Sequence, residues 1–251
     1  MNLLTGKVAL ITGSGEGMGR AHARLMAERG AAIVVADMNA TTANETAEMV
    51  RALGRSAHVE IVDMGDVAQV QRMVERSIEA LGRIDILVNN AGIGQRVETS
   101  EVSVADFDRM FSVHVRGAFF AVQAVVPGMK QARSGKIINI SSIWGMTGAP
   151  IAPHYCGAKA ALLGMTKAWA KEFAPWNIHV NAVAPGGVLS GGPLRYETPE
   201  QLKAKQEKVL LRRYADPVEI SYAVAFLASS EADFVTGQVI SPNGGDVIVG
   251  M

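Results

Sequence analysis

Two hydrophobic periodicities meet within the segment KVALITGSGEGMGRAHARLMAERG (7–30). Its first part, KVALITG (7–13), is a short apolar run that stops at a turn, as a buried parallel strand does. Its second part, GMGRAHARLMAERG (17–30), repeats apolar residues at helical spacing and closes on a glycine, which is typical of a helix C-terminal cap. The segment therefore predicts a strand, a glycine turn and a helix.

The glycine turn has the spacing T-G-x-x-x-G-x-G, with Gly13, Gly17 and Gly19 as its glycines. Glycines at such a turn let the backbone approach a pyrophosphate, and the helix N-terminus supplies N–H donors. A flexible loop is the alternative, but the position between a strand and a helix favours a dinucleotide site. We therefore predict cofactor contacts at these glycines and at Ser14 and Met18.

Asp37 ends the next apolar run, AAIVVAD (31–37), 18 residues after Gly19. A carboxylate at that place accepts hydrogen bonds from the adenosine ribose and repels a 2′-phosphate. Arg20 is the one cation near enough in sequence to compensate for a phosphate. Alternatively, Asp37 caps the helix that starts near Thr41. We predict NAD as the cofactor in preference to NADP.

Strands and helices continue to alternate along the chain. The patterns predict helices near 41–53, 67–81, 104–131, 154–174 and 217–229, and strands near 57–62, 85–92, 135–142, 178–186 and 237–242. Strict alternation implies right-handed crossovers and a parallel sheet covered on both faces. With no linker or repeat in sight, we predict one α/β domain over 1–251, a Rossmann-type doubly wound parallel sheet. The segment 187–216 is less regular, with a charged helical stretch inside it.

The composition excludes several classes of function. Lysine plus arginine equal aspartate plus glutamate, 24 against 24, which argues against a nucleic-acid partner. The apolar runs VALI and AIVVA are far shorter than the ~20 residues that span a bilayer. The start of the chain does not resemble a signal peptide, and Cys156 is the only cysteine. We expect a cytoplasmic protein with no membrane partner and no metal site.

The stretch HYCGAK (154–159) places Tyr155 and Lys159 four residues apart, on one face of the predicted helix. Tyrosine is a poor base at its ordinary pKa of ~10, and a nearby ammonium favours the phenolate. An acid/base group poised closer to the working pH suits alcohol oxidation or carbonyl reduction. For this pair alone, a packed tyrosine and a solvated lysine are the favoured alternative.

Further motifs stand in order around that pair: Thr12-Gly13, Asn89-Asn90-Ala91-Gly92, Ser142 thirteen residues before Tyr155, and Pro185-Gly186. With them the chain resembles the compact branch of the short-chain dehydrogenase/reductase family. The likeness runs from the first strand to the tail TGQVISPNGG (236–245). It implies an NAD-dependent oxidoreductase that interconverts a secondary alcohol and a ketone.

The resemblance also implies roles. Tyr155 is the expected general acid/base, Lys159 lowers its pKa and holds the nicotinamide ribose, and Ser142 binds the substrate oxygen; Ser141 is expected to be structural. The further cofactor contacts implied are Asp63, Met64, Asn90, Ala91, Gly92, Pro185, Gly186, Val188 and Ser190.

The stretch FSVHVRGAFF (111–120) departs from the family pattern, because His114 stands where an asparagine normally completes the catalytic set. In the family that residue helps to hold a water that links the lysine to solvent. Imidazole also bonds water, so we expect a working relay. A compensated structural substitution and a damaged relay are the alternatives.

The substrate side is expected after the NNAG strand, after Ser142 and after Pro185-Gly186. Candidate pocket residues there are Gln95, Trp144, His154 and Tyr196, with Met146, Ile151, Arg96 and Arg195 nearby. They suit a cyclic or medium-sized secondary alcohol or ketone, with or without a carboxylate or thioester.

Two other functions stay open. A 3-oxoacyl-thioester (acyl carrier protein or CoA) reductase usually takes NADPH, so Asp37 counts against it. A non-catalytic dinucleotide-sensing protein is the other. Relatives commonly form tetramers, and the apolar tail DVIVGM (246–251) suits burial in a homotetramer.

Overall fold

The computed structural model describes residues 3–191 and 197–249. Its sheet has seven parallel strands in the order β3-β2-β1-β4-β5-β6-β7. They are β1 (Val8–Thr12), β2 (Ala32–Asp37), β3 (Ala57–Ile61), β4 (Ile86–Asn89), β5 (Gly135–Ile140), β6 (Ile178–Val183) and β7 (Val239–Ile240). The chain starts at the centre of the sheet, moves outward to β3 and returns to β4 on the other side of β1. Ligands bind where the strand order reverses in this way, at the carboxyl ends of the strands.

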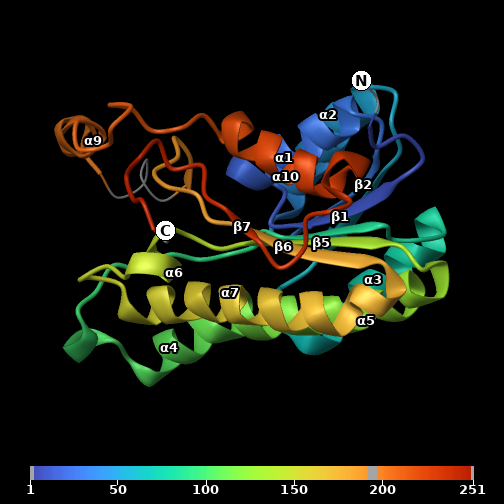
Figure 1. The fold of residues 1–251 in the computed structure, drawn as a ribbon, viewed down its shortest axis with the longest axis horizontal. Coiled ribbons are helices and arrows are strands. Elements are labelled where there is room, and N and C mark those ends of the chain that lie inside the picture. The colour runs from blue at the N-terminus through green and yellow to red at the C-terminus, as the bar shows by residue number, and fades with distance from the viewer. Residues whose placement is uncertain (1–2, 192–196, 250–251) are drawn as a thin grey trace.

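Helices cover both faces of the sheet, which confirms the predicted Rossmann-type doubly wound fold (Figure 1). One layer holds α1 (Gly17–Glu28), α2 (Ala40–Ala52) and α10 (Pro217–Ala228). The other layer holds α3 (Val67–Leu81), α4 (Val104–Phe111), α5 (Gly117–Ala132) and α7 (Pro153–Phe173). The short helix α6 (Trp144–Thr147) and α9 (Pro199–Gln206) lie at one end of the sheet.

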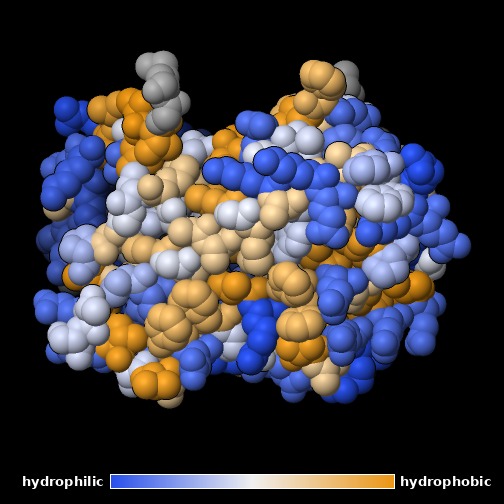
Figure 2. Space-filling model, turned by 60° about the horizontal axis from the view of Figure 1, so that its bottom comes forward, coloured by the Kyte–Doolittle hydropathy of each residue, from blue (hydrophilic) through white to orange (hydrophobic). Residues whose placement is uncertain are grey.

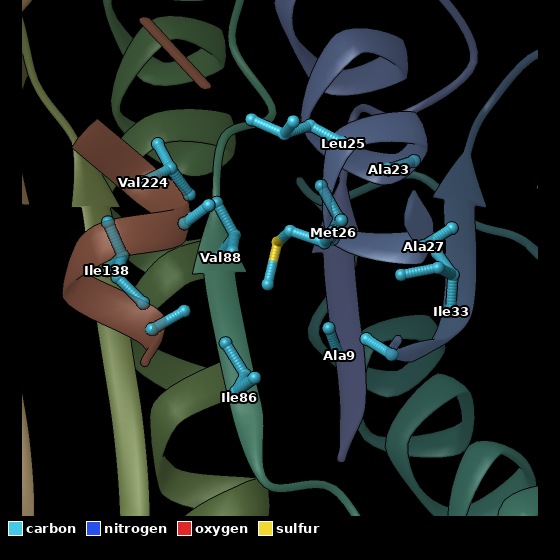
Figure 3. Packing of buried hydrophobic residues seen from close by; sticks show 14 of the residues in the cluster. Ala9, Ala23, Leu25, Met26, Ala27, Ile33, Ile86, Val88, Ile138 and Val224 are labelled. Carbon is cyan, nitrogen blue, oxygen red and sulfur yellow. The ribbon is translucent and has the colours of Figure 1, made fainter. Parts of the chain in front are cut away.

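The core forms because each strand turns alternate side chains to opposite faces. Ile33, Ile86 and Val88 belong to the cluster under α1 and α10, where Met26 fills the space between them (Figure 3). Leu10, one residue along from Ala9, belongs instead to the cluster under α3, α5 and α7. Strands buried on both faces explain the continuous apolar runs in the sequence.

The largest departure from expectation is the helix predicted over 104–131. It is interrupted by a π-helical turn, Ser112–Arg116, which joins α4 to α5 and carries His114. Such turns insert one residue and redirect the side chains around them. Val104–Ala132 is also the one described stretch long and apolar enough to cross a membrane, but 56% of its apolar window is buried inside the protein. The core helix of a soluble protein has the same properties.

Candidate active site

A cleft of about 780 Å³ opens at the carboxyl ends of the strands. All predicted catalytic and cofactor residues except Ser14 line it, as do Gln95 and Trp144. Residues from opposite ends of the chain thus meet in one place.

The glycine turn at one end of the cleft is tightly packed. Gly13 and Gly17 have φ values of 63° and 55°, in the left-handed region that favours glycine. A Cβ atom on Gly19 would collide with the carbonyl oxygen of Gly13. The Asn90 side chain donates from Nδ2 to the carbonyl oxygens of Thr12, at 2.8 Å, and Gly13, at 3.0 Å. These contacts hold the turn against the end of β4.

Asp37 lies beside this turn at the end of β2. Its Oδ2 accepts from the Gly15 N–H at 2.8 Å and its Oδ1 from the Asn39 N–H at 3.0 Å. The cap of α2 is Asn39, whose Oδ1 accepts from the N–H of Thr41 and Thr42, so Asp37 does not serve as the helix cap. Its carboxylate faces the cleft instead.

Two neighbours of the turn do not reach the cleft. Ser14 is buried, and its hydroxyl donates to the Ile11 carbonyl at 2.7 Å and accepts from the Ala36 N–H at 3.1 Å. The prediction that Ser14 contacts the cofactor therefore fails for its side chain, which joins β1 to β2. The guanidinium of Arg20 donates to the Gly15 carbonyl at 2.8 Å and pairs with Glu45 at 2.7 Å.

Asp63 lines the cleft with a partner that the sequence did not indicate. Arg109 donates from Nη1 to both of its carboxylate oxygens, at 3.0 and 2.9 Å, and the Gly65 N–H donates at 2.8 Å. Burial raises the pKa of Asp63, but these hydrogen bonds outweigh burial and bring the pKa below its ordinary value. The aspartate is thus held ionised and in place.

Lys159 is buried on the first turns of α7. Its Nζ donates to the Ile140 carbonyl at 2.8 Å and lies 5.7 Å from the ring centre of Tyr155. Ser141 is structural, as expected, because its hydroxyl donates to the Lys159 carbonyl at 2.8 Å. Burial lowers the pKa of Lys159 to about 7. The lysine can therefore exchange its proton near neutrality.

Tyr155 points into the cleft beside this lysine. Burial raises the pKa of Tyr155, and a side-chain hydrogen bond with Ser142 offsets part of that rise. The expected lowering of this pKa by Lys159 is not found. The physical reason is that burial opposes both charged forms, the ammonium as well as the phenolate.

His114 is buried against the back of the catalytic pair. Its Nε2 lies 3.0 Å from the Ile93 nitrogen and 2.8 Å from the Ile93 oxygen, so it bonds one or the other according to its tautomer. The ring stands edge-on to Tyr155, with centres 5.5 Å apart, and its buried Nδ1 has no hydrogen-bond partner among the described residues. Burial is the larger cause, and the charge of Lys159 the next, of a pKa of His114 well below its ordinary value. The ring is therefore neutral.

The substrate side is only partly as predicted. Trp144 stands edge-on to Tyr155, with ring centres 6.0 Å apart. His154 does not line the cleft; it is buried behind it, with Nε2 3.0 Å from Oε1 of Gln95, so it positions a wall residue instead. The prediction for Tyr196, like that for Arg195, falls outside the described residues.

Several cleft residues had no signal in the sequence. Glu197, Lys205 and Tyr214 line the substrate side, and Tyr214 packs on the backbone of Gly187. They come from the irregular segment 187–216, where no periodicity or motif indicates which side chains point into the cleft. Across residues 3–191 and 197–249, no three His, Cys, Asp or Glu side chains gather as a metal site would require.

The comparisons agree with this geometry. The sequence model for short chain dehydrogenases matches residues 7–200. The chain is 38% identical over 246 residues to 3-oxoacyl-[acyl-carrier-protein] reductase FabG of Thermotoga maritima, covering 98% of this chain and 99% of that protein. It is 37% identical over 248 residues to cyclopentanol dehydrogenase of Comamonas sp., covering 98% of each. Carveol dehydrogenase from Mycobacterium avium, solved in complex with NAD, superposes with a TM-score of 0.93 at 31% identity, covering 98% of this chain and 99% of that one.

The chain belongs to the short-chain dehydrogenase/reductase family, as its motifs indicated. It is an oxidoreductase that acts on CH–OH groups with a nicotinamide dinucleotide as cofactor.

The depressed pKa of Lys159 predicts a pH dependence of stability. Between about pH 7 and the ordinary pKa of 10.5, Lys159 is neutral when folded but protonated when unfolded. The unfolded chain then binds more protons, so the free energy of unfolding rises with pH. We expect Lys159→Met to flatten this rise in urea unfolding between pH 7 and 9.5. The exposed Lys171 on the same helix is the control, and equal slopes for wild type and Lys159→Met would contradict the assignment.

The contact between Gly92 and His114 predicts a non-additive pair of mutations. A Cβ atom on Gly92 would lie 2.5 Å from Cε1 of His114, whose buried ring has little room to move. We expect Gly92→Ala to lower the free energy of unfolding by about 1–3 kcal/mol, as overpacking does. In a His114→Ala background the same change should cost less than about 0.5 kcal/mol. Urea unfolding of the four proteins measures both costs, and equal costs would mean that the ring is not what excludes the methyl group.

Proposed function

We propose that the protein is an NAD-dependent oxidoreductase that interconverts a secondary alcohol and a ketone. One observation supports the proposal above all. Tyr155, which is hydrogen-bonded to Ser142 and lies next to Lys159, is in the same cleft as the glycine turn and Asp37. An acid/base group and a dinucleotide cradle are thus within reach of one bound substrate.

The lining of the cleft supports a dinucleotide cofactor. A Cβ atom on Gly13 would come 2.7 Å from Cα of Ala91, so the glycine turn packs directly against the chain that follows β4. The Asp37 carboxylate accepts from Gly15 in this turn, and the Pro185 carbonyl accepts from the Ile143 N–H, next to Ser142, at 3.1 Å. When bound, the nicotinamide ring accepts or supplies the hydride.

The residues of the chain handle the proton. Tyr155 donates its proton to the carbonyl oxygen during reduction, and in oxidation its phenolate form accepts the hydroxyl proton of the alcohol. The Ser142 hydroxyl donates to the same oxygen and stabilises the charge that develops there. Lys159, fixed by the Ile140 carbonyl, holds or passes a proton near pH 7 because of its lowered pKa.

We further propose that His114 acts in this proton path as a neutral ring. It contacts Tyr155 edge-on, and its buried Nδ1 has no partner within residues 3–191 and 197–249. The narrow space behind the cleft, which His114 and Asn89 help to line, has no room for a water molecule. We therefore propose that the ring acts through its contact with Tyr155 and not through a water on that side.

Preference for NAD rests on two side chains. The Asp37 carboxylate faces the cleft where the adenosine ribose is expected, and it would repel a 2′-phosphate. Arg20, the cation that could compensate, is held by Glu45 and by the Gly15 carbonyl.

A cyclic secondary alcohol suits the substrate side best. Trp144 and Ile143 offer an apolar wall next to Tyr155, and two of the similar proteins are named for cyclic alcohols, cyclopentanol and carveol. The Thermotoga maritima relative is named as a 3-oxoacyl-thioester reductase, which keeps that substrate as the second candidate. Asp37 counts against it if the reaction takes NADPH.

Assembly as a homotetramer stays a prediction. The lower layer of Figure 1 carries hydrophobic residues among hydrophilic ones on its outer face (Figure 2). Phe119 on α5 is 42% exposed and Ile248 in the tail is 79% exposed, and burial of either in an interface would be favourable. A cytoplasmic location and the lack of a membrane partner also stay predictions, as does the lack of a nucleic-acid partner, which the charge balance supports.

The function is tested by NADH formation with cyclopentanol, cyclohexanol, carveol and 1-phenylethanol, and by NADH oxidation with acetoacetyl-CoA. We expect at least one cyclic alcohol to be oxidised, and Tyr155→Phe to lower kcat/KM by about 10²–10⁴, because the proton acceptor is lost. NAD binding, followed by protein fluorescence, should persist in the variant. Tight NAD binding without turnover by the wild type would favour the dinucleotide-sensing alternative.

The cofactor preference is tested at Asp37. We expect Asp37→Ala to raise the KM for NAD about 10–100-fold, because the ribose loses its carboxylate partner. The double variant Asp37→Ala/Glu45→Ala, which also releases Arg20, should increase kcat/KM for NADP further. Steady-state kinetics with both cofactors measure this, and an unchanged NAD/NADP ratio would refute the role of Asp37.

A further inference from the structure

The Glu197 carboxylate on the substrate side of the cleft is only half satisfied. Its side chain is 2% exposed, and Oε1 accepts from Arg96 Nη2 at 2.8 Å and from Lys205 Nζ at 2.7 Å. Oε2 is buried and has no hydrogen-bond partner in the described part of the chain. A buried carboxylate oxygen without a donor is costly, so its retention suggests a ligand that supplies the donor.

A chain of side-chain contacts leads from Tyr155 to this carboxylate. Trp144 contacts Tyr155 edge-on, and the Arg96 guanidinium lies 5.7 Å from the centre of the Trp144 ring. Arg96 in turn holds Glu197. A substrate whose carbinol is at Tyr155 and whose apolar body rests on Trp144 would therefore have its far end beside this carboxylate.

The charges on this side favour a neutral donor over an anion. Arg96 and Lys205 both donate to Oε1, so an anionic group would have to displace a carboxylate that is almost fully buried. An ammonium group would meet the same two cations. A hydroxyl group has no charge, so it neither competes with the carboxylate for the two cations nor is repelled by them. Its hydrogen bond to a charged acceptor is stronger than one between neutral groups.

We propose that Glu197 determines substrate specificity by accepting, at Oε2, a hydrogen bond from a second hydroxyl group at the end of the substrate remote from the reacting carbinol. The substrates are then secondary alcohols that carry an apolar ring and a distal hydroxyl. This inference rests on the proposed function and names the substrate class of the same site.

Three 1-phenylethanols with different para substituents test the proposal: methyl, hydroxymethyl and carboxylate. With NAD and the wild-type protein, we expect kcat/KM for the hydroxymethyl compound to exceed that for the methyl compound about 10–100-fold. A site built around a hydrogen bond discriminates against the analogue that lacks it. The carboxylate compound should be the poorest of the three.

Glu197→Gln removes the free acceptor without changing the size of the side chain. Arg96 and Lys205 keep the amide oxygen facing them, which turns the amide NH₂ toward the place of Oε2. We expect the preference for hydroxymethyl over methyl to fall below about 3-fold. Glu200→Gln, the same change at an exposed carboxylate on α9 that does not line the cleft, is the matched control and should keep the preference.

A wild-type enzyme that oxidises the methyl and hydroxymethyl compounds equally well would overturn the proposal, as would an unchanged preference in Glu197→Gln. The highest kcat/KM for the carboxylate compound would also overturn it, and would assign Arg96 and Lys205 to an anion. Glu197→Asp, which retracts the carboxylate but keeps its charge, should lose the preference too, so the result does not depend on how well Glu197→Gln folds. Failure of the proposed function is distinct: no alcohol would give Tyr155-dependent NADH.

Discussion

The hydrogen bonds that connect the end of β1 to the end of β4 are the constraint on which the site depends. The Thr12 hydroxyl donates to the Val88 carbonyl at 3.3 Å and accepts from the N–H groups of Asn90 and Ala91, both at 3.0 Å. The Asn90 side chain in turn donates hydrogen bonds to the carbonyl oxygens of Thr12 and Gly13. Parallel strands alone would leave a crevice of variable width here. These side-chain hydrogen bonds connect the glycine turn to the chain that follows β4, where Gly92 packs on the His114 ring.

A second constraint is the low exposure of the catalytic side chains. Lys159 and His114 are buried and Tyr155 is partly buried, and in each case burial shifts the pKa toward the neutral form. The site therefore carries little charge of its own before a ligand arrives. A group of neutral, closely packed acids and bases is sensitive to any charge introduced nearby, because the surroundings screen it weakly. The π-helical turn belongs to the same arrangement, since it carries His114 to the ring of Tyr155.

The sequence predicted the features that depend on local pattern. The alternating apolar runs indicated each major strand and helix, and glycines fixed by backbone geometry marked the cofactor end of the cleft. Side-chain direction was harder to predict: Ser14 and His154 stand beside true cleft residues yet point away, into bonds with Ile11 and Gln95. Side-chain pairs that are distant in sequence were not predicted at all. Asp63 and Arg109 are 46 residues apart, and no motif in the sequence indicates that they pair.

This difference separates the two ends of the cleft in a way that bears on the whole family. At the cofactor end the backbone itself forms the wall of the cleft, so the glycines that this backbone geometry needs form a short motif in the sequence. At the substrate end the wall is built from side chains of separate loops, as where Arg96 meets Glu197 across 101 residues. Such pairs can change without disturbing the sheet. A solved relative shares this fold with a TM-score of 0.93 at 31% identity, so the sheet and its helices tolerate the replacement of most side chains.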